Sequence, residues 1–243
     1  AVLYRDASMI NLLNETFQKQ LNIATPICHT FHPTPAEYLA STFAPNEDID
    51  ADTIYELFYQ PCFPSFCPND VLLDRLNTDI IPPEMQNVIV DYFSKIRAQY
   101  QNKHISFTLE GLNYFMETGR VTEIPDFMYS YLTPPQRLTM LKAIVASVDD
   151  GSFTPRLIRS EKLTVPSPIC ICAPNEHKVI IYYFSPDKGQ YIFSLQELSL
   201  VQAFYDFLTY LHESPLVYSL DESKAMLHNV LEKYQQHPNF LQS

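Results

Sequence analysis

Residues Ser167 to Leu195 read "SPICICAPNEHKVIIYYFSPDKGQYIFSL". Three segments rich in β-branched and aromatic residues are separated there by the turn sequences Pro-Asn-Glu-His and Pro-Asp-Lys-Gly. The pattern predicts a three-stranded antiparallel meander between about residues 168 and 195. Cys170 and Cys172 are two positions apart on the first strand, so we expect both thiols on one face, within the core.

Two helices are predicted after the meander. "SLQE" from Ser194 and "SLDE" from Ser219 each have the residue order of a capping box. Apolar residues then recur every three or four positions from Leu198 to Leu211, which predicts an amphipathic helix. Because one face of the meander must be covered, we expect the helix from Glu197 to be its nearest cover.

The chain before about residue 150 predicts helices. "TPAE" from Thr34 and "TPPQ" from Thr133 have the order of helix starts, with Pro at the first helical position. Apolar spacing predicts long helices from Pro83 and from Leu138, and shorter ones at Ser8–Gln20, Asp52–Gln60, Asn69–Asp79 and Thr108–Thr118.

The predicted fold class is α+β, mainly helical: an N-terminal helical region, then a three-stranded antiparallel meander covered by two C-terminal helices. Its two regions are residues 1–150 and 151–243, with "DDGSFTPRL" as the boundary, or alternatively one continuous domain.

Composition excludes several classes of protein. The 243 residues carry a net charge of −12, which repels phosphate backbones, so we expect no direct DNA binding. No apolar run is long enough for a membrane span. Five Cys without a signal peptide predict free thiols and a cytoplasmic location. The start at Ala1, without Met, indicates a processing or cloning scar, and hence a fragment of a longer protein.

No motif predicts catalysis. The sequence contains no Gly-x-Ser-x-Gly, HExxH, Walker or GxGxxG pattern, so no catalytic residue and no cofactor are predicted. The densest group of metal-type ligands has a spacing unlike that of a zinc site, so no metal site is predicted either. That group comprises Cys28, His29, His32, Cys62 and Cys67.

Aromatic side chains concentrate in "IYELFYQPCFPSFCP", Ile54 to Pro68. One interpretation is an aromatic patch of the core. The other is the wall of an apolar pocket for a small ligand or peptide, with two tyrosine hydroxyls as its polar groups. The candidate ligand-binding residues are Tyr55, Phe58, Tyr59, Phe63 and Phe66.

Residues from about 105 to 225 resemble the C-terminal region of helix-turn-helix transcriptional regulators of Firmicutes. The first matching motif is a helix with the positions Ser194, Glu197, Ser199, Leu200, Ala203, Phe204, Asp206 and Phe207. The second is the segment Leu216, Val217, Tyr218, Ser219, Asp221, Glu222 and Ser223. No helix-turn-helix is present in this chain, which is where it departs from the family.

The resemblance implies an effector-binding or dimerisation domain of a DNA-binding regulator. Its DNA-reading domain would precede Ala1, and DNA would be bound only through that domain. A homodimer and an unknown small-molecule or peptide effector are the implied partners, because operator half-sites are read by two-fold dimers. Two alternatives stay open: a protein–protein interaction module not linked to DNA, and an enzyme without a recognisable motif.

Overall fold

The computed structural model describes residues 52–61, 66–122, 124, 126–165, 169–185 and 189–236. All of these residues belong to one compact unit of the chain. The strands are β1 (Thr53–Leu57), β2 (Asn102–Phe107), β3 (Phe153–Leu157), β4 (Ile169–Asn175), β5 (Lys178–Ser185) and β6 (Gly189–Leu195). The helices are α4 (Asn69–Arg75), α5 (Pro83–Gln99), α6 (Leu109–Thr118), α7 (Pro134–Asp149), α8 (Leu198–Glu213) and α9 (Leu220–Gln235).

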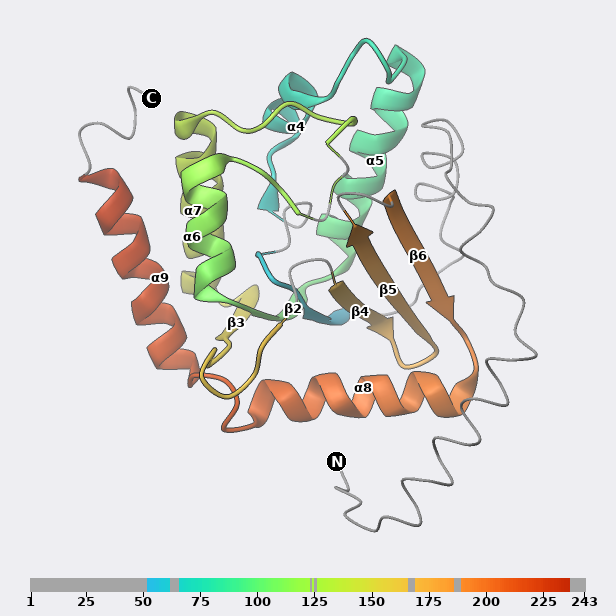
Figure 1. Ribbon diagram of the computed structural model, residues 1–243, viewed down its shortest axis with the longest axis vertical. Helices are drawn as coiled ribbons and strands as arrows, with labels where there is room; N and C mark the ends of the chain where they lie inside the picture. The colour runs from blue at the N-terminus through green and yellow to red at the C-terminus, as the bar shows by residue number, and fades with distance from the viewer. Residues whose placement is uncertain are drawn as a thin grey trace. The chain divides into compact units, whose positions relative to one another are not determined.

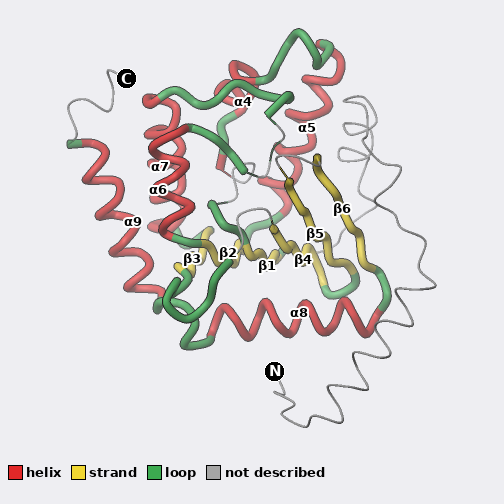
Figure 2. Tube along the Cα trace, viewed as in Figure 1, coloured by secondary structure: helices red, strands yellow, loops and turns green. Residues whose placement is uncertain are grey.

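All six strands form one mixed sheet in the order β3-β2-β1-β4-β5-β6, which Figure 2 shows from left to right. The pairs β1–β2 and β2–β3 are parallel, and β1–β4, β4–β5 and β5–β6 are antiparallel. Parallel neighbours need a long crossover, and here helices α4 and α5 lead from β1 to β2, and α6 and α7 lead from β2 to β3. Strands from both sides of residue 150 therefore share one sheet.

The predicted fold class is wrong, because the three strands between Ile169 and Leu195 are half of this six-stranded mixed sheet rather than a separate meander. The segment Asp52–Gln60, predicted as a helix, contains β1 instead. Of the two C-terminal helices, α8 packs on β1, β2, β4 and β5, whereas α9 packs on α7 and β3. The helices predicted at Ser8–Gln20 and after Thr34 lie outside the described residues.

The sheet separates two apolar cores, and helices lie on both of its faces (Figure 1). On one face, Ile105, Phe107 and Phe153 pack with buried residues of α4, α5, α6, α7 and α9. On the other face, Leu57 and Val179 pack with buried residues of α8. Both faces are covered, as is usual where strands run parallel. No helix among the described residues is long and apolar enough to cross a bilayer.

Several helix ends follow the sequence signals. Thr133 and Ser219 form capping boxes with Gln136 and Glu222 at the starts of α7 and α9, as predicted. The start of α8 differs from the prediction, because Glu197 rather than Ser194 is its N-cap. The Glu197 carboxylate accepts hydrogen bonds from the N–H groups of Ser199 and Leu200, at 3.3 and 2.9 Å.

β3 is an edge strand whose outer side is closed by other groups. Ile158, the residue directly after β3, donates its N–H to the Phe107 carbonyl of β2, so by alternation the N–H positions of residues 155 and 157 face outward. Pro155 has no N–H, and the Leu157 N–H donates to the buried Ser223 hydroxyl of α9 at 3.0 Å. The Leu157 carbonyl in turn accepts from the Tyr218 N–H at 2.8 Å.

Replacing Ser223 by Ala is expected to lower the free energy of unfolding by about 1–3 kcal/mol, because the buried Leu157 N–H then has no partner. Chemical denaturation measures the change. Ser147→Ala is the matched control, since the Ser147 hydroxyl donates only to the Ala143 carbonyl of its own helix. An equal loss in both variants would contradict the role assigned to Ser223.

Candidate functional site

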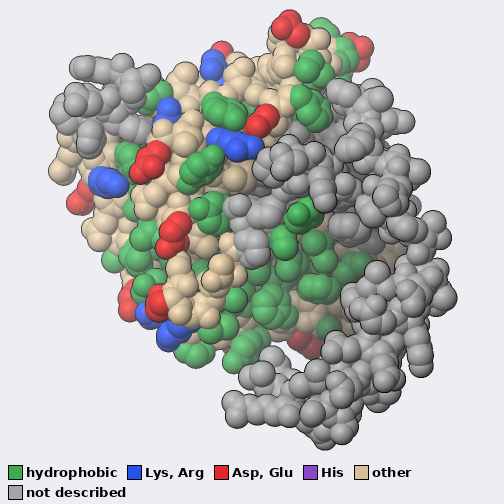
Figure 3. All heavy atoms as spheres, in the orientation of Figure 1, with side chains coloured by type: hydrophobic (Ala, Val, Ile, Leu, Met, Phe, Trp, Pro, Cys, Tyr) green, Lys and Arg blue, Asp and Glu red, His purple; other side chains and the backbone are tan. Residues whose placement is uncertain are grey.

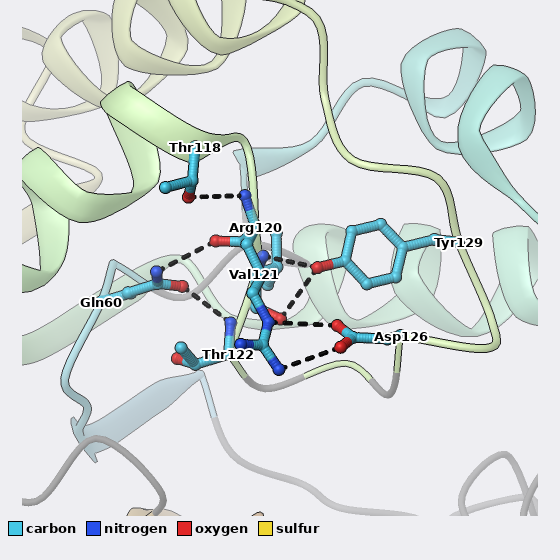
Figure 4. Close-up of polar contacts among 7 residues, drawn as sticks. All are labelled: Gln60, Thr118, Arg120, Val121, Thr122, Asp126 and Tyr129. Atoms are coloured by element: carbon cyan, nitrogen blue, oxygen red, sulfur yellow. Dashed lines mark hydrogen bonds and ion pairs between the residues drawn. The ribbon is translucent and has the colours of Figure 1, made fainter. Parts of the chain in front are cut away.

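The loop between α6 and α7 is held by hydrogen bonds from side chains to its backbone (Figure 4). The buried Gln60 amide donates to the Arg120 carbonyl at 3.0 Å and accepts from the Thr122 N–H at 2.9 Å. The Tyr129 hydroxyl likewise accepts from the Val121 N–H and donates to the Val121 carbonyl. Gln60 and Tyr129 thus each donate one hydrogen bond to the loop backbone and accept one from it. Their role is to fix the conformation of the loop.

A second polar group lies between the sheet and α8, and its hydrogen bonds are incomplete. It consists of Tyr55 on β1, His104 on β2, Arg156 on β3 and His212 on α8, and we call it the histidine cluster. Tyr55 and His104 are aligned neighbours in the parallel β1–β2 pair, so the sheet register places their rings together. His212 reaches the same place from the last turn of α8.

The rings of the histidine cluster are in direct contact. Tyr55 stacks on His104 with ring centroids 4.7 Å apart and planes inclined by 15°. His104 Nδ1 lies 3.3 Å from His212 Nε2, and the two rings are nearly perpendicular, at 84°. One nitrogen of this pair therefore donates and the other accepts, and each ring has one further nitrogen.

Burial sets the charge state of the two histidines. The His212 side chain is 5% exposed. Burial lowers its pKa to about 3, and the neighbouring His104 and Arg156 lower it in the same direction. Burial, and then the Arg156 charge, also lower the pKa of His104. Both imidazoles are therefore neutral at neutral pH, because a charged ring here would be desolvated and would face a guanidinium.

Arg156 links the sheet to the end of α8. Its Nε donates to the His212 carbonyl at 2.8 Å, which satisfies one of the carbonyls that the helix end leaves open. The buried Arg156 Nη1 and the buried His212 Nδ1 have no hydrogen-bond partner within the described part of the chain. Burial lowers the pKa of Arg156, and the Glu213 carboxylate acts in the opposite direction.

The chemistry of these two atoms favours an oxygen ligand. Arg156 Nη1 can only donate. When His104 Nδ1 donates to His212, the His212 Nδ1 carries a proton and also donates. Two donors without partners then suit a carboxylate or phosphate oxygen, since hydrogen bonds to a charged oxygen are stronger than neutral ones. Among the described residues, no group of three His, Cys, Asp or Glu side chains could hold a metal ion.

The residues predicted to line a pocket do not share one face of the sheet. Tyr55 packs beside the core under α8 and belongs to the histidine cluster. Phe58 and Phe66 are buried in the core on the other face, where Phe66 contacts Phe153. The Tyr59 carbonyl accepts hydrogen bonds from Thr108. Phe63 lies outside the described residues.

The cysteines that the structure describes are buried, and they lie on the face of the sheet opposite to the histidine cluster. Cys170 and Cys172 both belong to the cores on the face away from α8, as their alternation predicted. Burial raises the pKa of the Cys67 thiol to about 12, which makes it a weak nucleophile. Cys28, His29, His32 and Cys62 lie outside the described residues.

Sequence reasoning found Tyr55 but missed His104, Arg156 and His212. These three residues are separated by about fifty positions each and carry no motif. Only the order of the strands and the position of α8 bring them together. The one local signal is a single polar residue at position 212, which falls on the apolar side of a helix that is otherwise buried through Val201, Leu208 and Leu211.

Comparison of the chain with protein-family models, curated proteins and solved structures gave no match. The resemblance to transcriptional regulators therefore depends only on the two motifs within residues 194–223 of this chain. Several of these have structural roles: Glu197 caps α8, Glu222 completes the capping box of α9, and Ser223 holds the edge of β3.

Proposed function

We propose that this chain is the effector-binding and dimerisation domain of a bacterial helix-turn-helix transcriptional regulator, located in the cytoplasm. Its DNA-reading domain precedes the chain, and the domain itself is not an enzyme. The observation that carries the proposal is the histidine cluster, where two buried polar atoms lack partners between the sheet and α8. The effector is a small molecule with a carboxylate or phosphate group that bonds Arg156 and His212.

Charge and position support a sensing role. A chain with net charge −12 is suited to bind DNA only through a separate basic domain. Arg156 and His212 join the sheet to α8 through one hydrogen bond and a shared cluster. A ligand that bonds both residues would favour one position of α8 relative to the sheet, and a ligand shifts an equilibrium only by such differential contacts.

Anion binding provides the first test. Acetate, benzoate and inorganic phosphate, added at millimolar concentration to the whole chain, are expected to raise its melting temperature. Arg156→Gln should weaken that binding about tenfold to hundredfold, because a charged hydrogen bond contributes about 1.5–3 kcal/mol. Calorimetric titration at pH 7 measures the affinities.

Arg159→Gln is the matched control. Arg159 also donates its Nε to a backbone carbonyl, that of Val217 at 3.2 Å, but it lies outside the histidine cluster. This variant should bind the anions with the affinity of the unmodified chain. Failure of all three anions to bind, or equal binding by Arg156→Gln, would contradict the effector site.

The gene upstream of the codon for Ala1 tests the regulator context independently. The proposal expects a basic helix-turn-helix segment within about 100 codons, the size of one small domain. An unrelated domain, or a start codon directly before Ala1, would contradict a regulator while leaving the anion test unaffected.

A further inference from the structure

α8 carries an apolar stripe on its solvent side. Leu200 is 49% exposed, Phe207 38% and Tyr210 60%, and Ala203 between them is also exposed. These four residues follow one another at intervals of three, four and three positions, so they form one continuous line along the helix. Figure 3 shows apolar side chains gathered along the lower part of the visible face, over α8.

The stripe takes no part in the packing of α8 on the sheet. α8 packs on the strands through Val201, Leu208 and Leu211, which occupy a separate side of the helix. At 100° per residue, Leu200, Ala203, Phe207 and Tyr210 lie on an adjoining side, and apolar residues thus cover well over half of the circumference. Large side chains grouped on a surface in this way are typical of an interaction site.

The stripe is complementary to itself when two helices run antiparallel. Its spacing of three, four and three reads the same in both directions, as a two-fold contact between identical chains requires. An antiparallel copy places Leu200 against Tyr210 and Ala203 against Phe207, a smaller residue opposite a larger one at every level. A parallel copy would instead place Phe207 against Phe207 and Ala203 against Ala203, which gives a clash beside a gap.

Charge does not prevent a second copy of this chain from packing on the stripe. The four stripe residues are uncharged, so two molecules of net charge −12 can meet there without burying carboxylates. Asp206 is the nearest acidic residue along the helix, and it accepts a hydrogen bond from Gln202 on the polar side, at 2.8 Å. The N- and C-terminal ends of antiparallel helices also bring opposite dipole ends together.

We propose that two copies of this chain dimerise through α8, packed antiparallel about a two-fold axis near residue 205, with Ala203 of each copy against Phe207 of the other. This contact gives the dimerisation part of the proposed function its interface, and it does not depend on the effector. The histidine cluster lies under the inner side of the same helix, through His212. α8 is therefore the element that both a ligand and a partner copy would contact.

Exchange of the two opposed residues is the decisive experiment. Phe207→Ala leaves two alanines opposite each other, and Ala203→Phe places two phenylalanines there, so each is expected to weaken dimerisation at least tenfold. The double exchange Ala203→Phe with Phe207→Ala restores one Ala against one Phe at each level. It is expected to recover most of the affinity. Sedimentation velocity over a range of concentrations measures the dissociation constants of the unmodified chain and of the three variants.

Because all four positions are solvent-exposed in one copy, these variants should fold, which circular dichroism checks. A double variant no better than the sum of the single ones would overturn the antiparallel arrangement. An unmodified chain that stays monomeric at about 100 μM would overturn the dimer itself.

Disulfide trapping tests the direction of the helices. A mixture of a Leu200→Cys chain with a Tyr210→Cys chain is expected to form cross-linked dimers on oxidation, above the background of the unmodified chain. Cross-linking of Leu200→Cys chains with one another, without cross-links between the two variants in the mixture, would contradict the proposal. Added salt should strengthen dimerisation, because it screens the repulsion between two acidic copies.

The α8 interface and the effector site can be contradicted independently of each other. A dimer that ignores all three anions would support the α8 interface and contradict the effector site. A monomer that binds anions through Arg156 would do the opposite.

Discussion

Gly111→Ala is expected to destabilise the domain by at least about 3 kcal/mol, or to prevent its folding, because the new methyl group has no space. A Cβ at Gly111 would lie 2.5 Å from the carbonyl carbon of Tyr59 and still closer to its oxygen. The Tyr59 carbonyl cannot retreat easily, since it accepts hydrogen bonds from both the N–H and the hydroxyl of Thr108, at 3.2 and 2.8 Å. The gain in helix propensity, about 1 kcal/mol, does not offset this overlap.

Asn113→Ala is the control for Gly111→Ala. Asn113 is half-buried on the same helix, α6, so its replacement adds the same alanine without the close backbone approach. We expect a change of about 0.5 kcal/mol or less there. Denaturant titration measures the stability of both variants. A Gly111→Ala protein as stable as the Asn113→Ala protein would show that the Tyr59 backbone, after β1, can move away from α6.

Acidification is expected to destabilise the domain through the histidine cluster, beginning near pH 6.5. His212 has a pKa lowered to about 3 in the folded protein, whereas in the unfolded chain it binds a proton at its ordinary value near 6.5. Below pH 6.5 the unfolded state therefore holds the extra proton. The free energy of unfolding then falls by about 1.4 kcal/mol per pH unit for this residue, until the folded pKa is reached. His104, whose pKa is also lowered, adds to the loss.

The test compares the unmodified chain with His104→Gln/His212→Gln, since glutamine keeps a donor and an acceptor but does not titrate in this range. The groups around the pair are Arg156, Tyr55, Tyr205 and Glu213, and they remain in both proteins. Denaturation at pH 8, 6.5, 5.5 and 4.5 should give a steeper decline for the unmodified chain. Parallel curves would mean that the two histidines are solvated in the folded protein.

The antiparallel half of the sheet was predictable because its signals are local. The β-branched runs and turn residues between Ser167 and Leu195 lie side by side in the chain and pair with one another. The parallel half was not predictable. β1 and β2 place the charged residues Glu56 and Lys103 inside the fold, so their sequences lack the pattern of a strand. Pro155 argues against a strand, yet an edge position with its nitrogen outward tolerates it.

The candidate site shows the same division between local and distant information. Tyr55, which belongs to the aromatic segment from Ile54, contacts both His104 and His212. The alternation of β1, however, sends Tyr55 and Phe58 to opposite faces of the sheet, which a helix over Asp52–Gln60 would not have done. His104 and His212 meet across 108 positions of sequence, and no local pattern encodes such a contact.

The closed edge at β3 also bears on how this protein behaves at high concentration. Exposed strand edges recruit strands of other molecules, and this pairing begins many forms of aggregation. At β3, Pro155 removes one outward donor, Ser223 occupies another, and Tyr218 occupies the Leu157 carbonyl. A strand from a neighbouring molecule would find little to pair with there. Amyloid-like growth is thus disfavoured along this side of the sheet, and loss of the Ser223 hydroxyl would open it.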